Sequence, residues 1–330
     1  MRTPSGSTPS RPSAARASTT LEGSARGDKF FRGLLTFAAL MVPALLLALF
    51  LELADGSRLA ISQFGLHFIV DSVWDPVAGQ FGAYPLIFGT LLTSFIALLL
   101  AVPLSLGVAI YLTEFAPQVI RQPVAMLIEL LAAIPSVVYG LWGVFVLIPV
   151  LKTSVFPFLR DTLGFLPFFR GAIYGPSVLA ASLILTIMIM PFIMSVSRSV
   201  LLAVPNSQRE AALALGATRW EAVRTAIVPY ARSGIIGAVI LGLGRALGET
   251  MAVTMLIGNR HDISASLFAP GYSMAAVIAN EFSEAATELH ISSLTYVALL
   301  LFVVTVLVNA GARLLIWRVA RGAAIGSKAL

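Results

Sequence analysis

The sequence predicts an all-α integral membrane protein with six transmembrane helices. The chain has a mean hydropathy of +0.91, and only 12% of its residues are charged, whereas a soluble domain is about 25% charged. Six apolar runs are long enough to cross a bilayer as helices, which takes about 20 residues each. Water-soluble enzymes are therefore excluded, and the lack of cysteine excludes disulfides, thiolate metal sites and cysteine nucleophiles.

The first 29 residues are predicted to form a disordered cytosolic tail, because they are rich in Ser, Thr, Pro, Ala and Arg and nearly lack large apolar side chains. The first transmembrane helix is predicted over residues 30–52, around the apolar run Phe31–Leu51. A cleaved signal peptide is the alternative. A retained helix is favoured because the run exceeds the usual h-region of about 7 to 15 residues and no clear A-x-A site follows.

The other five helices are predicted within a core of residues 86–317, and residues 318–330 are predicted to form a cytosolic tail. Pro135 is expected to bend the third helix, and Tyr139 could bind the carbonyls that the bend frees or line a path. A loop is predicted over Leu151–Arg170. The five helices are predicted at Leu86–Leu112, Pro123–Pro149, Ile173–Val196, Gly234–Gly258 and Leu294–Ile316.

The distribution of positive charge predicts the orientation of the chain. Six spans place both termini on one side of the membrane, and 16 of the 22 Lys and Arg residues lie on that side under this topology. Such segments normally face the cytosol. We therefore expect a multi-pass membrane protein with both termini and the stretch Ser197–Ser233 in the cytosol. The net charge of +6 reflects this topology, so no nucleic-acid partner is expected.

One predicted span carries two charges in its interior. Arg245 lies about 16 Å from Gly234, near the middle of a hydrocarbon core about 30 Å thick. An arginine there costs about 2.5–3.5 kcal/mol and requires a partner or a watery cavity. In a continuous helix, Glu249 would share a face with Arg245. The pair predicts an anion-handling site on a transport path, and the alternative is an ion pair that only holds the helices together.

The cytosolic stretch is predicted to form two short helices around a glycine. Ser207 with Glu210 and Thr218 with Glu221 have the spacing of capping boxes, which mark helix starts. Gly216 is suited to end the first helix, and Pro229 is expected to break the chain toward the next span. A docking hairpin for a soluble partner is favoured over a solvated hairpin without a role and over a helix-turn-helix that binds DNA.

This stretch resembles the EAA motif of the permeases of ATP-binding-cassette (ABC) importers. The motif is carried by Glu210, Ala211, Ala212, Gly216 and Pro229, although Ala226 and Val228 stand where isoleucine and leucine are usual. The segments GRALGETMAV from Gly244, IELLAAIPSVVYG from Ile128 and SLFAPGYSMAAVIANEF from Ser266 are more specific. They resemble the C-type permeases of bacterial phosphate importers. The resemblance extends over essentially everything after the N-terminal tail.

The resemblance implies a type I importer permease fold in which segment 206–230 couples to an ATPase, and a location in the bacterial cytoplasmic (inner) membrane. It also implies four kinds of partner: a homologous A-type permease, an ATPase dimer, an extracytoplasmic phosphate-binding protein and membrane lipid. The chain lacks the P-loop pattern G-x-x-x-x-G-K-[ST], so ATP is expected to be used by the ATPase, and this chain is expected to hold no cofactor or metal and no catalytic residue. Arg245 and Glu249 are expected to serve translocation, and Gly244 and Gly248 to pack helices.

Three other functions stay open. The nearest are a permease for another oxyanion and the A-type partner itself. A secondary anion transporter would need neither the hairpin nor an ATPase. An intramembrane enzyme is disfavoured, because the spans contain no Ser/His pair, H-E-x-x-H or paired aspartates at a common depth.

Overall fold

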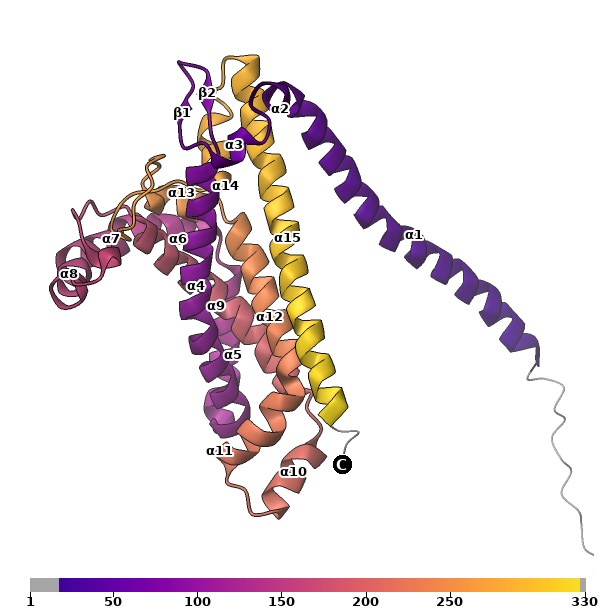
Figure 1. Cartoon of the computed structure of the whole chain (residues 1–330). Helices are drawn as coiled ribbons and strands as arrows, with labels where there is room; N and C mark the ends of the chain where they lie inside the picture. Colours follow the sequence, from indigo (N-terminus) through magenta and orange to yellow (C-terminus); the bar gives the residue numbers. More distant parts are fainter. Residues whose placement is uncertain (1–17, 327–330) are drawn as a thin grey trace, which may run out of the picture. The chain divides into compact units, whose positions relative to one another are not determined.

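The computed structural model describes residues 18–326, which are mostly helical (Figure 1). The chain divides into two compact units, Met1–Glu52 and Leu53–Leu330. Six helical segments of the described residues are long and apolar enough to cross a membrane, which confirms the predicted number of spans. They are Lys29–Gly56, Tyr84–Phe115, Ser136–Leu163, Val178–Leu202, Arg219–Gly248 and Glu288–Leu314.

The first unit consists of most of helix α1 (Ser18–Gly56). This helix begins earlier than predicted, since residues 18–29 were expected to belong to the disordered tail. The physical reason is that extending an existing helix costs far less than starting one. Residues 1–17 lie outside the described part. From Phe30 to Leu51 this helix is apolar on all sides apart from Arg32 and Thr36, as expected of a helix that crosses a membrane.

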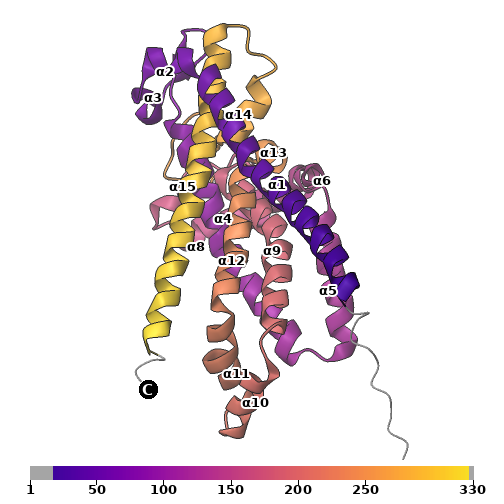
Figure 2. The same ribbon diagram turned by 90° about the vertical axis from the view of Figure 1, so that its right-hand side faces the viewer.

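The second unit has a small aromatic domain at one end. Here β1 (Trp74–Asp75) pairs antiparallel with β2 (Gln80–Phe81), beside the short helices α2 (Arg58–Phe64) and α3 (His67–Val70). The ring of Phe68 stacks on that of Tyr296 with centroids 4.5 Å apart. Figures 1 and 2 place this β-hairpin end opposite the end formed by α10 (Asn206–Ala214) and α11 (Arg219–Ala222).

Helix α9 (Val178–Leu202) lies at the centre of the second unit. In the most apolar stretch of this span, 72% of the residues are buried among the described residues, a larger share than in any other candidate span. It packs against α4 (Tyr84–Ile110) and α12 (Val228–Gly248). Helix α15 (Glu288–Gly326) runs alongside α12 in Figure 1. Helix α9 is therefore the element around which the other helices of this unit pack.

The predicted third span is wrong, because the chain breaks at Pro135 instead of bending there. Helix α5 (Gln118–Ala133) ends before the proline and α6 (Ser136–Trp142) begins after it. The extended backbone that proline favours at this point stops the helix. Tyr139 donates its hydroxyl to the Leu131 carbonyl at 2.9 Å, which confirms that it satisfies a freed carbonyl.

Helical structure then continues to Leu163, where a loop was predicted over Leu151–Arg170. The predicted loop is therefore largely wrong, because the apolar run continues the helix beyond Pro149. The remaining α-helices are α7 (Ile148–Val150), α8 (Phe156–Leu163), α10 (Asn206–Ala214), α11 (Arg219–Ala222), α13 (Met251–Ile257) and α14 (Met274–Glu281). Tyr111–Phe115, Gly143–Leu147, Leu151–Val155 and Val223–Ile227 are π-helical turns, and Pro167–Phe169 is a 3-10 turn.

Candidate functional site

Arg245 lies near the end of α12 and faces the central helix α9. Its guanidinium carbon is 4.6 Å from the ring centroid of Phe192. Its Nε atom is buried and has no hydrogen-bond partner among the described residues. A cation over an aromatic face gains about 0.5–2 kcal/mol, less than a full set of hydrogen bonds to an anion would give. The site thus presents a cation whose hydrogen-bonding capacity is not used up by the protein.

The predicted pairing of Arg245 with Glu249 does not form. Helix α12 ends at Gly248, and Glu249 has an extended backbone (φ −71°, ψ 125°), so the expected continuous helix Gly234–Gly258 is wrong. Glu249 instead accepts, at 3.5 Å, from the backbone N–H of Ala252 in the first turn of α13. The extended residue removes the four-residue alignment, and the ion pairs found among the described residues include neither Arg245 nor Glu249.

The glycines that bring α12 close to its neighbour differ from the pair singled out in the sequence. A Cβ on Gly242 would meet Ile193 at 2.6 Å, and one on Gly234 would meet Val200 at 2.4 Å, both on α9. Gly244 has only an ordinary contact with Asn309 at 3.9 Å, and Gly248 faces open space in the described structure. A packing role for Gly244 and Gly248 therefore stays a prediction.

The segment with the EAA pattern forms the expected helical hairpin at the α10–α11 end. Gly216 has a positive φ of 85°, which confirms its role as a helix stop. Thr218 and Glu221 form both hydrogen bonds of a capping box, as predicted. The first capping box is wrong, because α10 begins at Asn206 and Ser207 makes no capping bond. Since Asn206 is already within the helix, Ser207 lies too late in the chain to cap it.

The outward surface of this hairpin is partly apolar. Glu210, Ala211 and Gly216 are exposed, and Ala212 is half-buried. Leu215 is 90% exposed and Trp220 is 58% exposed. Exposed apolar side chains at a helical tip are typical of an interaction surface.

Pro229 does not break the chain as predicted. It lies at the start of α12, which follows the π-helical turn Val223–Ile227 without a gap. The proline removes one backbone hydrogen bond at this point, and the helix passes there from the π-helical turn to α12 without ending. The hairpin is therefore joined to α12 by unbroken helix from Arg219 onward.

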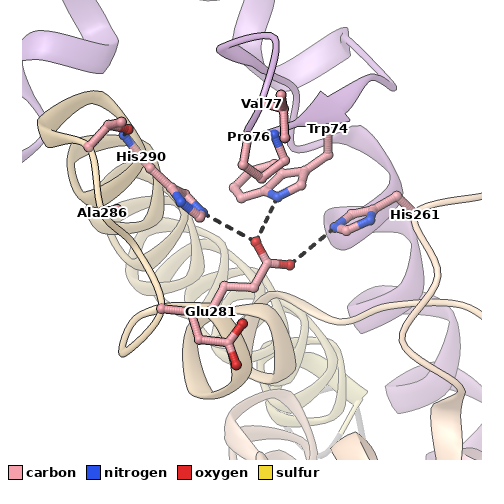
Figure 3. Close-up of a pocket in the computed structure, with 9 residues that line it drawn as sticks. Trp74, Pro76, Val77, His261, Glu281, Ala286 and His290 are labelled. Carbon is pink, nitrogen blue, oxygen red and sulfur yellow. Dashed lines mark hydrogen bonds and ion pairs between the residues drawn. The ribbon is translucent and has the colours of Figure 1, made fainter.

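A second polar cluster, at the β-hairpin end, was not predicted from the sequence (Figure 3). The carboxylate of Glu281 accepts from Trp74 Nε1 at 2.9 Å. It also lies 3.3 Å from His290 Nε2 and 3.7 Å from His261 Nε2. Together with Val77 and other residues, this cluster lines an open cavity of about 440 Å³. The cluster joins the β-hairpin, the loop before α14, α14 itself and the start of α15.

We expect this cluster to make the stability of the folded protein depend on pH. Burial lowers the pKa of His261, and the nearby carboxylates of Glu281 and Asp262 offset only part of that shift. Because the folded protein then binds fewer protons than the unfolded chain, stability is lost as the pH falls below about 6.5.

We expect the melting temperature to fall on going from about pH 7.5 to about pH 5.5, and to fall less in His261→Gln than in the wild type. Thermal unfolding in detergent measures this. His67→Gln changes an exposed histidine on α3 and is the matched control. Equal pH dependence in His261→Gln and wild type would contradict the expectation.

Comparison with known proteins places this arrangement in a family. Residues 101–321 match the family described as "binding-protein-dependent transport system inner membrane component". The chain belongs to this family. The matched region includes both the EAA pattern and the span that contains Arg245.

Among the residues that the structure describes, no group of three or more His, Asp or Glu could hold a metal ion.

Named proteins can be aligned with this chain over most of its length. A protein of Mesorhizobium japonicum named phosphate transport system permease protein PstC is 47% identical, over 88% of this chain and 90% of its own length. Its namesake in Haemophilus influenzae is 48% identical, over 88% and 93%. A chain of a bacterial ABC transporter involved in import of the acidic polysaccharide alginate shares the fold, with a TM-score of 0.54 at 18% identity over 89% of this chain and 99% of that one.

Proposed function

We propose that the chain is the transmembrane permease subunit of an ATP-driven importer that moves inorganic phosphate into the cytoplasm. The observation that carries the proposal is the identity of 47–48% with two proteins named as phosphate permeases, over 88% of this chain. The charge and geometry around Arg245 support the same substrate class.

Arg245 is suited to an oxyanion such as phosphate. Phosphate carries about one to two negative charges near neutral pH, and a guanidinium offers a planar fork of donors that matches its oxygens. Since Phe192, not a carboxylate, contacts the guanidinium, the cation keeps donors free for a passing anion. An anion that is bound moderately can also leave, as transport requires.

The hairpin from α10 to α11 would be the part of the chain that binds the ATPase. We assign it to the cytosolic side, together with both termini, because the positive residues gather there. Its exposed Leu215 and Trp220 would enter the partner, and the unbroken helix from Arg219 to Gly248 would carry motion toward Arg245. In this assignment the chain hydrolyses no ATP itself. A homologous permease and an extracytoplasmic phosphate-binding protein would complete the importer.

Uptake of labelled phosphate into vesicles that contain the assembled importer tests this function. We expect uptake that requires ATP, is reduced by excess unlabelled phosphate and is little affected by sulfate or phosphonate. Purification of the chain should also recover a nucleotide-hydrolysing subunit. Stronger competition by sulfate or phosphonate would indicate another oxyanion, and uptake without any ATPase would indicate a secondary transporter.

A further inference from the structure

Arg209, next to Glu210 on α10, makes more hydrogen bonds than any other side chain that the structure describes. Its Nη2 and Nε atoms bind the carboxylate of Glu114 at 2.9 Å and 3.2 Å. The same guanidinium donates to the carbonyl of Leu201 at 2.9 Å and to that of Val204 at 2.6 Å. The side chains of Arg209 and Glu114 are only 20% and 12% exposed. The arginine is therefore held by two partner elements at once.

These partners belong to the ends of α4 and α9, the two helices that pack most extensively on each other. Glu114 lies in the π-helical turn Tyr111–Phe115 that continues α4. Leu201 lies in the last turn of α9, and Val204 lies just beyond it. Carbonyls at a helix C-terminus lack partners within the helix, so a cation there is favourable. Arg209 thus joins α10 to α4 and to α9 in a single contact.

Apolar packing strengthens the same junction. Leu112 at the end of α4 and Leu201 at the end of α9 are buried together with Val223 and Ile227, which follow α11. The opposite side of α10 is different, because Glu210 and Ala211 are exposed. One side of α10 is therefore free to meet a partner while Arg209 holds the other side against the helix bundle.

We propose that Arg209 is a positioning residue that couples movement of the hairpin to α4 and α9, in addition to the direct connection through α12. This inference rests on the proposed function. Its consequence for the anion site is direct, because Phe192, the residue over which Arg245 lies, is itself on α9. A displacement of α10 would move α9 and change the contact that holds Arg245. The salt-bridged carboxylate of Glu114 makes the connection rigid, since two parallel hydrogen bonds fix orientation as well as distance.

The test compares Arg209→Gln, Glu114→Gln and the double variant in the assembled importer reconstituted in vesicles. We expect each single variant to assemble and hydrolyse ATP, but to lower the phosphate transported per ATP by roughly tenfold, since the paired hydrogen bonds that fix α10 on α4 are lost and only the connection through α12 remains. The double variant should lose no more than the single ones, because both act through the same contact. Arg209→Lys, which keeps the charge but loses the fork, should fall in between.

Arg58→Gln is the control, because it breaks an ion pair at the surface. The side chains of Arg58 and its partner Asp55 are 80% and 64% exposed. An unchanged ratio in Arg209→Gln would overturn the inference. So would a parallel fall of ATP hydrolysis and transport together with low complex levels, which would indicate a merely structural role.

Hydrogen exchange of α10 separates this inference from the proposed function. In Arg209→Gln, the amides of residues 206–214 should exchange faster than in the wild type, whatever the substrate is. Unchanged exchange would overturn the inference alone. A wild-type assembly that takes up no phosphate, in contrast, would contradict the proposed function.

Discussion

Replacing Arg245 with glutamine is expected to reduce phosphate uptake by roughly ten- to a hundredfold at normal levels of the assembled importer. The reason is that a hydrogen bond to a charged group contributes about 1.5–3 kcal/mol, and each 1.4 kcal/mol corresponds to about tenfold. Because Arg245 contacts Phe192 and not a carboxylate, its removal leaves no unpaired charge behind. The bundle should therefore still form, and the loss should appear in transport alone.

Arg245→Lys distinguishes the two roles that the sequence left open. A lysine keeps the charge but offers no planar fork, so an anion contact predicts a clear loss of uptake. A role in charge balance alone predicts that lysine suffices. Labelled phosphate uptake, normalised to the amount of complex, decides between them. Arg160→Gln removes a half-exposed arginine next to Asp161 and is the control. Wild-type uptake in Arg245→Gln would contradict the proposed site.

Gly89→Ala is expected to destabilise the protein strongly. A Cβ at this position of α4 would lie 2.0 Å from the backbone carbonyl oxygen of Tyr272 and 3.0 Å from its carbon. A backbone group cannot rotate away, so α4 and the segment before α14 would have to separate. Overpacking of this kind costs about 1–3 kcal/mol or more. We expect a melting temperature lower by about 5 °C or more, or loss of folded protein.

The same helix offers a matched control. Gly107 also lies within α4, but nothing lies within 4 Å of an added Cβ. Gly107→Ala should leave the melting temperature unchanged or raise it, because alanine favours a helix interior over glycine by about 0.5–1 kcal/mol. Thermal unfolding of the two variants in detergent compares them directly. Equal melting temperatures would show that α4 does not pack closely on Tyr272.

The predictions that proved correct concern features set by residues near one another in the chain. Six apolar runs gave six candidate spans, because burial of a helix in lipid depends on its own composition and length. Gly216 ends its helix and Thr218 caps the next one, since both effects act within about four residues. The hydroxyl of Tyr139 reaches a carbonyl only eight residues away.

The predictions that failed depend on how neighbouring segments compete. Ser207 and Glu210 have the right spacing for a cap, but the helix starts one residue earlier. Arg245 and Glu249 have the right spacing for an ion pair, but the helix ends between them and Glu249 binds the next helix instead. Spacing predicts a contact only if the backbone between the two residues stays helical, and here that depends on the packing of α12 and α13.

By itself, the sequence determined the membrane-spanning class, the number of spans, the buried cation Arg245 and the hairpin around Gly216. Only the tertiary structure decided what those elements touch. Arg209 meets Glu114 across 95 positions of the chain, and Trp74 meets Glu281 across 207. The physical reason is that local propensity acts over a few residues, whereas such contacts exist only once helices far apart in the chain have packed side by side.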